Sequence, residues 1–411
     1  MLIEISEKLN KLAKKFPCDI YIVGGYVRNK IMGLDDSDID ICSQLTVDEL
    51  EKLLKDSEYK VKIKSKSLGA ALITIDEEQY EYTTLRKDFY AEGGQHLPEK
   101  VEFIKDVKED SKRRDFTCNS IYYDIKNDKI LDFYDGVKDI QDGILRAIET
   151  PEEVFSHDGV RILRLFRFEC ELNLKIDKKT LEAACKYKNN LRDVSGERVV
   201  HEITCILHSS SAYKISKKNA YMKALKHFNK ANLWPIFGID CPKIKFNMVK
   251  KAEHKSQGFL IDVIDTVRPI SISYYLNLIL SESFGLGKKM VEHYIKILSG
   301  YYEALNKLQN KPYFFKYFDK FPDIYQLLIH KSKYLANKYQ FFYKYIIAHK
   351  LIVSVKDLDI NGEDIKKNYP TVSPERYKPI LDSLLSDIFD GRLNNEKEEL
   401  INAVEKKLKY L

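Results

Sequence analysis

Two acids, Asp38 and Asp40, stand one residue apart in the stretch DSDIDIC and alternate with Ile39 and Ile41. On a β-strand, residues i and i+2 point to the same face, so we expect both carboxylates to project together. Two carboxylates this close repel each other and lose solvation, and a divalent cation removes both problems. Mg²⁺ prefers carboxylates combined with substrate phosphates. The pair predicts a Mg²⁺ site beside a nucleotide; a solvated acidic turn is the alternative.

A glycine pair lies upstream of these acids. Gly24 and Gly25 follow the apolar run IYIV and open the helix-like stretch YVRNKIM. Glycine lets the backbone approach a phosphate, and the N–H groups at a helix N-terminus favour an anion. Arg28, one turn into this helix, can reach the same anion. The spacing fits neither a P-loop nor a dinucleotide-binding fingerprint. A phosphate cradle followed by a metal pair indicates nucleotidyl transfer.

Two further stretches carry candidate nucleotide-binding residues. In KRRDFTCNS, the side chains of Arg114, Asp115 and Asn119 could bind a triphosphate or a ribose, or could form a surface charge cluster. Glu81, in QYEYTTL, is a candidate third carboxylate at the metal site, although strand alternation explains it almost as well.

The stretch HDGVRILRLFRF repeats a charged residue every three positions, at Asp158, Arg161, Arg164 and Arg167. We expect these residues along one side of a helix. A carboxylate accepts from an exocyclic amine and a guanidinium donates to ring acceptors, so an Asp–Arg pair can recognise cytosine or adenine. An ordinary helix with intrahelical Asp–Arg pairs is the alternative.

The expected secondary structure differs between residues 1–150 and the rest of the chain. The first 150 residues read as mixed α/β, with strands expected at DIYIV, DIDIC, KVKIK, GAALITI, QYEYTTL and SIYYDI, and a helix after an N-cap at Thr46. The rest has helical periodicity. Residues 301–350 are rich in Tyr, Phe and Lys; a helical core with lysines reaching solvent is favoured over a base-stacking surface.

Composition narrows the class of protein. With 411 residues, 44% of them hydrophobic, the chain can form two to four domains. It has no 18-residue apolar run and no signal-peptide pattern at its N-terminus, so neither a membrane span nor secretion is expected. Seven cysteines without a C-x-x-C pair fit a reducing cytoplasm.

Charge is distributed unevenly along the chain. Residues 1–150 hold 24 Lys and Arg against 31 Asp and Glu, a net −7, whereas the remainder of the chain carries +13. A basic, helical rear part can follow a polyanion such as nucleic acid. Solvation of helices by surplus lysine is the alternative.

Several motifs together resemble one family. GGYVRN, DSDID, KRRDFTCNSIYYD, LDFYDGVKDI, HDGVRILRLFRF and SGERV are similar, in order, to the motifs of the class II tRNA nucleotidyltransferase/poly(A) polymerase family, within the polymerase-β-like superfamily. The resemblance is strong over residues 20–205. It implies an α+β polymerase-β-like head, with a mixed sheet and helices, followed by an all-helical neck, body and tail. The expected boundaries are 1–148 for the catalytic head, 149–207 for the neck, 208–330 for the body and 331–411 for a tRNA-binding tail.

The resemblance also implies an activity. It is the template-independent addition of the 3′-terminal CCA to tRNA from CTP and ATP, with Asp38 and Asp40 holding Mg²⁺ and pyrophosphate leaving. Asp158 and Arg161 would read the base, with Arg164 and Arg167 nearer the triphosphate, and the helical rear would grip the acceptor arm. A CC-only or A-only enzyme, or a poly(A) polymerase, is the alternative; the intact stretch between residues 86 and 101 favours full CCA addition.

Two positions depart from the family pattern. Asn29 replaces the acid that usually follows the arginine, and a local change in hydrogen bonding is expected there. His157 replaces the glutamate that usually precedes the aspartate, which bears on how Asp158 is held.

Overall fold

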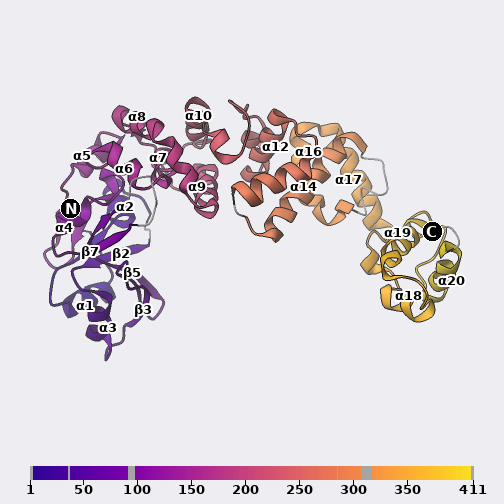
Figure 1. Cartoon of the computed structure of the whole chain (residues 1–411), viewed down its shortest axis with the longest axis horizontal. Coiled ribbons are helices and arrows are strands. Elements are labelled where there is room, and N and C mark those ends of the chain that lie inside the picture. Colours follow the sequence, from indigo (N-terminus) through magenta and orange to yellow (C-terminus); the bar gives the residue numbers. More distant parts are fainter. Residues whose placement is uncertain (1–2, 36–37, 91–97, 285, 308–315, 409–411) are drawn as a thin grey trace. The chain divides into compact units, whose positions relative to one another are not determined.

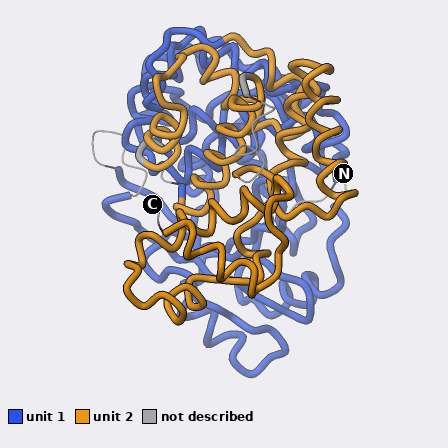
Figure 2. Tube along the Cα trace, turned by 90° about the vertical axis from the view of Figure 1, so that its right-hand side faces the viewer, with its two compact units in different colours: residues 1–244, 282–286 blue, residues 245–281, 287–411 orange. Residues whose placement is uncertain are grey.

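The structure is a computed structural model that describes residues 3–35, 38–90, 98–284, 286–307 and 316–408. It divides into two compact units (Figure 2). The first comprises residues 1–244 and 282–286, and the second comprises residues 245–281 and 287–411. The four segments expected from the sequence are a finer division and stay a prediction. Within the described ranges, no helix is both long and apolar enough to cross a membrane.

A seven-stranded mixed sheet forms the first part of the first unit. Its strand order is β3-β4-β5-β2-β1-β8-β9, and only the β2–β5 pair is parallel. The strands are β1 (Ile20–Val23), β2 (Ile39–Ser43), β3 (Lys60–Ser65), β4 (Ala70–Ile75), β5 (Glu78–Thr84), β8 (Tyr122–Asp124) and β9 (Lys129–Leu131). A separate antiparallel ribbon joins β6 (Arg86–Phe89) to β7 (Lys100–Phe103). All six strands expected from the sequence are present, and the predicted α+β head is confirmed.

The helices of this part, labelled in Figure 1, are α1 (Glu7–Lys15), α2 (Gly25–Met32), α3 (Val47–Leu54), α4 (Val107–Ser111) and α5 (Gly136–Gln141). All but α4 pack against one face of the sheet, and Val107 of α4 packs against the other. Leu9 of α1 and Leu50 of α3 share a core with Ile41 of β2. Thr46 caps α3 in a capping box, as predicted. Because side chains alternate along β2, Asp40 lies on the opposite face of the sheet from Ile41.

A helical part completes the first unit. It contains α6 (Pro151–His157), α7 (Val160–Glu171), α8 (Lys178–Lys186), α9 (Gly196–His208) and α10 (Met222–Ala231). Helix α7 packs against both α9 and α10. One small departure from the all-helical expectation is a two-stranded parallel pair, β10 (Ile144–Leu145) with β11 (Lys175–Ile176). Helix α7 therefore has neighbours on several sides, which fixes its charged side chains.

The expectation that Asp158 lies on the same helix as the three arginines is wrong. Helix α6 ends at His157 and α7 begins at Val160, so the chain bends at Asp158 and Gly159. A Cβ on Gly159 would lie 2.3 Å from the carbonyl oxygen of Asn190, so only glycine permits this close approach. Asp158 has extended backbone, and its Oδ1 accepts a hydrogen bond from the Val160 N–H at 3.0 Å. Its side chain thus stabilises the start of α7 from outside the helix.

The second unit is helical throughout its described residues. Its helices are α11 (Met248–Lys251), α12 (Lys255–Val267), α13 (Ile272–Asn277), α14 (Lys288–Lys307), α16 (Phe321–Lys331), α17 (Lys333–Ala348), α18 (Gly362–Asn368), α19 (Tyr377–Phe389) and α20 (Lys397–Leu408). The predicted aromatic core is present on the inner side of α17. There Phe321 stacks on Tyr339 and Tyr343, with ring centroids 4.9 and 3.6 Å apart.

Candidate nucleotide-binding and catalytic site

A cavity of about 570 Å³ in the first unit collects the predicted site residues except Asp38 and the candidate carboxylate Glu81. Its walls come from α2, β2, the segment 114–119, the α6–α7 bend, α7 and α9. The predicted residues that line it are Gly24, Gly25, Arg28, Asp40, Arg114, Asp115, Asn119, Asp158, Arg161, Arg164 and Arg167. Residues more than 140 positions apart are thereby brought to one polar site.

Asp40 lies in the middle of the sheet at the head end of this cavity. Its strand neighbours are Val23 on β1 and Glu81 on β5. Burial raises the pKa of Asp40 to about 6. Arg114 opposes this shift, whereas the nearby carboxylates of Glu81 and Asp38 add to it. The ionised form of Asp40 is therefore poorly compensated by the protein alone.

The other two acids near Asp40 differ in their surroundings. Asp38 is exposed and lies immediately before β2, which begins at Ile39. Glu81 is also exposed and accepts a hydrogen bond from Lys64 Nζ at 2.6 Å. Glu81 thus stands beside Asp40 as a candidate third carboxylate but already has a cationic partner.

The glycine pair and Arg28 form the next wall of the cavity. Gly24 has φ of 81°, a conformation that favours glycine, and a Cβ there would lie 3.6 Å from Asp40 Oδ2. Arg28 is buried, and its Nη1 donates to Asn119 Oδ1 at 2.7 Å. Its Nε and Nη2 donate to Asn29 Oδ1 at 3.1 and 2.7 Å. The amide of Asn29 therefore holds the arginine in place.

Asp115 joins the head to helix α7. It accepts hydrogen bonds from Asn119 Nδ2 at 3.1 Å and from Arg164 Nε at 2.8 Å. Burial alone would raise the pKa of Asp115, but Arg164 and the Asn119 amide outweigh it and lower the pKa to about 2. Asp115 is consequently a fixed anion that orients Arg164 at the cavity wall.

The two candidate base-reading residues are both held by protein partners. Asp158 Oδ2 accepts from Arg198 Nη2 at 2.8 Å. Arg161 is buried, and its Nη2 donates to the carbonyl oxygen of Arg113 at 2.7 Å. A carboxylate has about four lone-pair sites and a guanidinium five N–H donors, so each side chain keeps capacity for a ligand.

Arg167 lies further along α7. Its guanidinium is 3.4 Å from Glu202 and 3.7 Å from Glu171, and it lies over the ring of Phe168 at 4.6 Å. Burial raises the pKa of Glu171 against the opposing charge of Arg167. Arg167 is thus the cation of a largely buried charge cluster at one end of the cavity.

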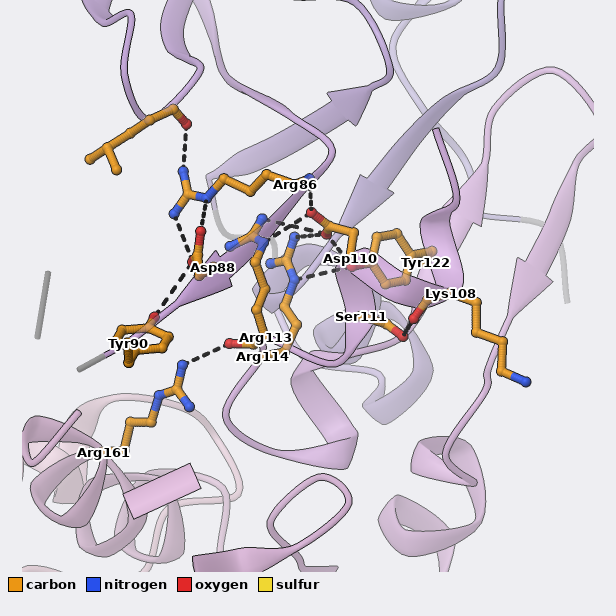
Figure 3. A network of polar contacts seen from close by, with 11 residues as sticks. Arg86, Asp88, Tyr90, Lys108, Asp110, Ser111, Arg113, Arg114, Tyr122 and Arg161 are labelled. Atoms are coloured by element: carbon orange, nitrogen blue, oxygen red, sulfur yellow. Dashed lines mark hydrogen bonds and ion pairs between the residues drawn. The ribbon is translucent and has the colours of Figure 1, made fainter. Parts of the chain in front are cut away.

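A second network ties the β6–β7 ribbon to the arginine pair before Asp115 (Figure 3). Asp110 is fully buried and accepts from Arg113 Nε at 2.9 Å, from Tyr122 Oη at 2.6 Å and from the backbone N–H of Arg86 at 2.9 Å. Arg114 Nη2 lies 3.5 Å from the same carboxylate. Arg113 is therefore directed at Asp110, whereas Arg114 contacts Asp110 and also lines the cavity.

The ribbon also reaches the α6–α7 bend through Tyr90. The ring of Tyr90 stacks on His157, with centroids 4.7 Å apart and planes at 11°. Burial and the Arg161 charge lower the pKa of His157, which favours a neutral imidazole. His157 therefore contributes a stacking surface where the family pattern has an acid.

Comparison with known proteins shows what the chain resembles. Residues 20–146 match the "Poly A polymerase head domain" family, and residues 173–228 match "Probable RNA and SrmB- binding site of polymerase A". A CCA-adding enzyme of Staphylococcus aureus is 28% identical over 401 residues, covering 95% of this chain and 94% of the relative. The chain is thus similar to the poly(A) polymerase head family over its first part and to CCA-adding enzymes along nearly its whole length. It is accordingly an enzyme.

Solved structures show the same fold. The Bacillus stearothermophilus CCA-adding enzyme in complex with CTP superimposes with a TM-score of 0.73 at 19% identity, covering 98% of both chains. The Thermotoga maritima CCA-adding enzyme complexed with tRNA(CCA) gives a TM-score of 0.57 at 19% identity, covering 98% of this chain and 96% of the other. The polymerase-type head followed by helices, expected from the sequence motifs, is thereby confirmed.

Several residues of the cavity had no role predicted from the sequence. Arg198, Tyr213, Phe168 and Glu171 also line it. Arg198 stands in the motif SGERV, so its place in a family motif was the available signal. Tyr213 receives a hydrogen bond from Arg28 Nη2 at 3.3 Å. No pattern around Tyr213 indicated that it would meet a residue 185 positions earlier.

The donor set near Asp40 fits a hard divalent cation. The described residues contain no cluster of three or more His, Cys, Asp or Glu side chains arranged to hold a metal. Asp40 nevertheless has a raised pKa caused by burial and by neighbouring carboxylates, and a cation would relieve both effects. Carboxylate oxygens completed by substrate phosphates are the ligands that Mg²⁺ prefers. The residues present therefore fit a Mg²⁺ ion that binds together with a nucleotide.

Proposed function

We propose that this enzyme adds the 3′-terminal CCA to tRNA, using CTP and ATP and releasing pyrophosphate. The observation that carries the proposal is the single cavity that joins Asp40 to Asp158 and Arg161. A proposed metal-binding carboxylate and a candidate base-reading pair then face the same bound nucleotide. The curated relative named a CCA-adding enzyme, matched along nearly its whole length, supports this choice.

Asp38 and Asp40 are the proposed metal ligands. Mg²⁺ bound there would supply Lewis-acid activation of the RNA 3′-hydroxyl and charge neutralisation at the triphosphate, in the two-metal manner. Asp40 presents its carboxylate from a rigid central strand beside Gly24, whose backbone can approach a phosphate. Asp38 lies immediately before this strand.

The phosphates are proposed to bind along the wall made by the glycine pair and the arginines. Gly24 and Gly25 open α2, and Arg28 is oriented by Asn119 and Asn29. Arg114 and Arg164 are each anchored on one buried carboxylate, Asp110 and Asp115 respectively. Preorganised cations of this kind stabilise developing charge without reorganising during the reaction.

Asp158 and Arg161 are proposed to select the base. Arg198 orients the Asp158 carboxylate, and carboxylate oxygens accept hydrogen bonds, as recognition of an exocyclic amine requires. Arg161 supplies the donor for the ring acceptor that cytosine and adenine share. Uracil and guanine do not present this combination, which accounts for selection of CTP and ATP without a template.

A basic surface of the helical rear is proposed to bind the tRNA acceptor arm through its shape and phosphates. In this proposal residues 1–148 are the catalytic head, 149–207 the neck, 208–330 the body and 331–411 the tail. All seven cysteines are free thiols, as expected of an enzyme that works in the reducing cytoplasm.

The second candidate is an enzyme of the same family with a shorter or different product, either a CC-only or an A-only adder or a poly(A) polymerase. The prediction from the stretch between residues 86 and 101 rests partly on residues 91–97, which lie outside the described residues. The described part of that stretch is the ribbon that contacts His157 through Tyr90.

One experiment separates these products. The full chain is incubated with tRNA lacking its last three nucleotides, plus Mg²⁺ and CTP alone, ATP alone or both, and product lengths are resolved on a denaturing gel. CCA addition predicts two added nucleotides with CTP alone and three with both nucleotides. Long A-tails with ATP alone would instead identify a poly(A) polymerase, and no extension under any condition would refute the proposal.

A further inference from the structure

One face of helix α17 carries large aromatic side chains that point to solvent. Tyr334, Phe341 and Tyr345 are 72%, 66% and 47% exposed. Their spacing of seven and four residues places them on one line along the helix, because i+7 and i+11 return to nearly the same angle. At about 1.5 Å per residue the line is roughly 16 Å long. We call these three residues the α17 stripe.

The α17 stripe is not the edge of the aromatic core. Its own helix contributes Ala336, Tyr339 and Ile346 to the interior of the second unit, and all three are buried. Those buried positions lie on the opposite side of α17 from the stripe. The aromatic residues of α17 therefore lie on two faces. One face packs into the core, as expected from the sequence, and the other is exposed.

The sequence that carries the α17 stripe is basic. Residues 324–356 contain six lysines and two histidines and no Asp or Glu. Lys338 is one turn after Tyr334 and three residues before Phe341, so it stands within the stripe. Neither Lys338 nor Lys344 makes a hydrogen bond or ion pair with any residue that the structure describes. These charges are available to an anionic partner.

We propose that the α17 stripe binds the flat faces of unpaired RNA bases, with Lys338 and Lys344 contacting the adjoining phosphates. Base–aromatic stacking combined with interleaved lysines is how proteins hold RNA segments that lack pairing partners. The inference rests on the proposed function, because it takes the RNA that is extended in the first unit as the partner. It adds a recognition element that depends on unpaired bases rather than on phosphates alone.

Two other occupants fit the α17 stripe less well. A membrane-surface helix carries its basic residues on the face opposite its apolar one, whereas Lys338 lies between the aromatic residues. Two of the three stripe residues are tyrosines, whose hydroxyls suit a wet surface. A second copy of this chain would bring Lys338 and Lys344 of both copies together at the stripe, and like charges repel.

The test compares two RNAs with the full-length chain. One is a tRNA transcript lacking its CCA end, which has unpaired loop bases, and the other is a blunt, fully paired RNA duplex with the same number of phosphates. The variant combines Tyr334→Ala, Phe341→Ala and Tyr345→Ala. All three positions are exposed and alanine favours helix, so the fold should persist, which far-ultraviolet circular dichroism checks. We expect Kd for the transcript to rise about tenfold or more and Kd for the duplex to stay unchanged.

Matched variants make the comparison sharper. Ile347→Ala removes an equally exposed apolar side chain of α17 that lies off the stripe, so it should change neither Kd. The combination Tyr334→Phe, Phe341→Tyr and Tyr345→Phe keeps every ring and should retain transcript affinity. Lys338→Gln should weaken both RNAs and reduce the salt dependence of binding by about one counterion.

Three outcomes would overturn the inference. They are an unchanged transcript Kd in the alanine variant, an equal loss on both RNAs, and a loss of binding to anionic lipid vesicles or of self-association while transcript affinity is retained. Failure of the proposed function would look different. A wild-type chain that binds the transcript in this way but never extends it would refute CCA addition and leave the α17 stripe as an RNA-binding surface.

Discussion

The nucleotide cavity of the first unit and the α17 stripe of the second unit use charge in opposite ways. In the cavity, Arg164 is paired with Asp115, and Asp158 with Arg198. On α17, lysines surround exposed aromatic rings and no acid is present in residues 324–356. The difference indicates that discrimination between small molecules needs charges fixed in advance by protein partners. RNA can be bound by surface lysines that have no acidic partner in the protein.

The largest expected effect tests the head end of the cavity. Asp40→Asn should lower the rate of nucleotide addition by on the order of 10³-fold or more, because charge stabilisation in phosphoryl transfer is lost. RNA affinity should change little, since Asp40 lies outside the basic, helical rear part of the chain. Single-turnover extension of tRNA and a separate RNA-binding titration measure the two quantities.

Glu81→Gln is the matched control for that prediction. Glu81 neighbours Asp40 across the β2–β5 pair but is exposed and paired with Lys64. Its amide variant should retain most activity. A loss as large as that of Asp40→Asn would make Glu81 a metal ligand, and near-normal turnover of Asp40→Asn in Mg²⁺ would disprove the metal assignment.

The next largest effect is expected on the stability of the first unit, through the Asp115–Arg164 ion pair. Asp115→Ala leaves Arg164 without its buried partner and should lower the free energy of unfolding of the first unit by about 3 kcal/mol. The single tryptophan, Trp234, is buried in this unit, so its fluorescence reports the unfolding of that unit. Denaturant titration of both proteins at neutral pH measures the difference.

The same pair has a defined pH dependence. The pKa of Asp115 is lowered to about 2 in the folded state. A lowered carboxyl pKa gives stability that is present above the unfolded value, near 4, and is lost as pH falls toward 2. The wild-type chain should therefore lose more stability than Asp115→Ala between about pH 4 and pH 2. Parallel curves for the two proteins would show that the pair contributes nothing to acid sensitivity.

A smaller effect is expected in nucleotide selection. Asp158→Ala and Arg161→Ala should each reduce the preference for CTP and ATP over UTP and GTP by about tenfold, the lower range for a lost bidentate base contact. The measurement is kcat/KM for all four nucleotides on truncated tRNA. A purely structural α6–α7 bend predicts a uniform fall in rate with unchanged ratios, and that result in both variants would contradict base reading by these residues.

The smallest effect comes from a surface pair of the first unit. Lys214 Nζ lies 3.0 Å from Asp35, and both side chains are largely exposed. Lys214→Ala should change the unfolding free energy by less than about 1 kcal/mol, because exposed ion pairs contribute little. The Trp234 signal used for Asp115→Ala gives the comparison directly. If Lys214→Ala lowered the unfolding free energy as much as Asp115→Ala, buried and exposed ion pairs would contribute equally to stability.

Features that depend on neighbouring residues in the chain could be predicted from the sequence. Strand alternation predicted β2 and the face on which Asp40 lies, and the helix start at Thr46 followed from capping chemistry. The bend at Asp158 could not be predicted in this way. It depends on the close approach of Gly159 to the backbone of Asn190, a contact between residues that are distant in the chain. The three-residue repeat of charges continued through the bend and concealed it.

The partners of the site residues were also beyond local patterns. Arg198 meets Asp158 only because α7 and α9 pack together. For α17, helical periodicity predicts two aromatic faces, but it does not predict which face packs against other helices. Both aromatic faces have similar composition, so only packing in the second unit distinguishes the buried Tyr339 from the exposed Phe341.

The place of β3 at the end of the sheet has a consequence for aggregation. An edge strand offers unpaired backbone groups to any other extended chain. In β3 the exposed positions of the alternating pattern are Lys60, Lys62 and Lys64, whereas Val61 and Ile63 are partly buried. A row of positive charge along this edge disfavours strand-to-strand association between molecules. Replacing these lysines with threonine would keep a good strand former there while leaving the sheet open to intermolecular β-pairing at high concentration.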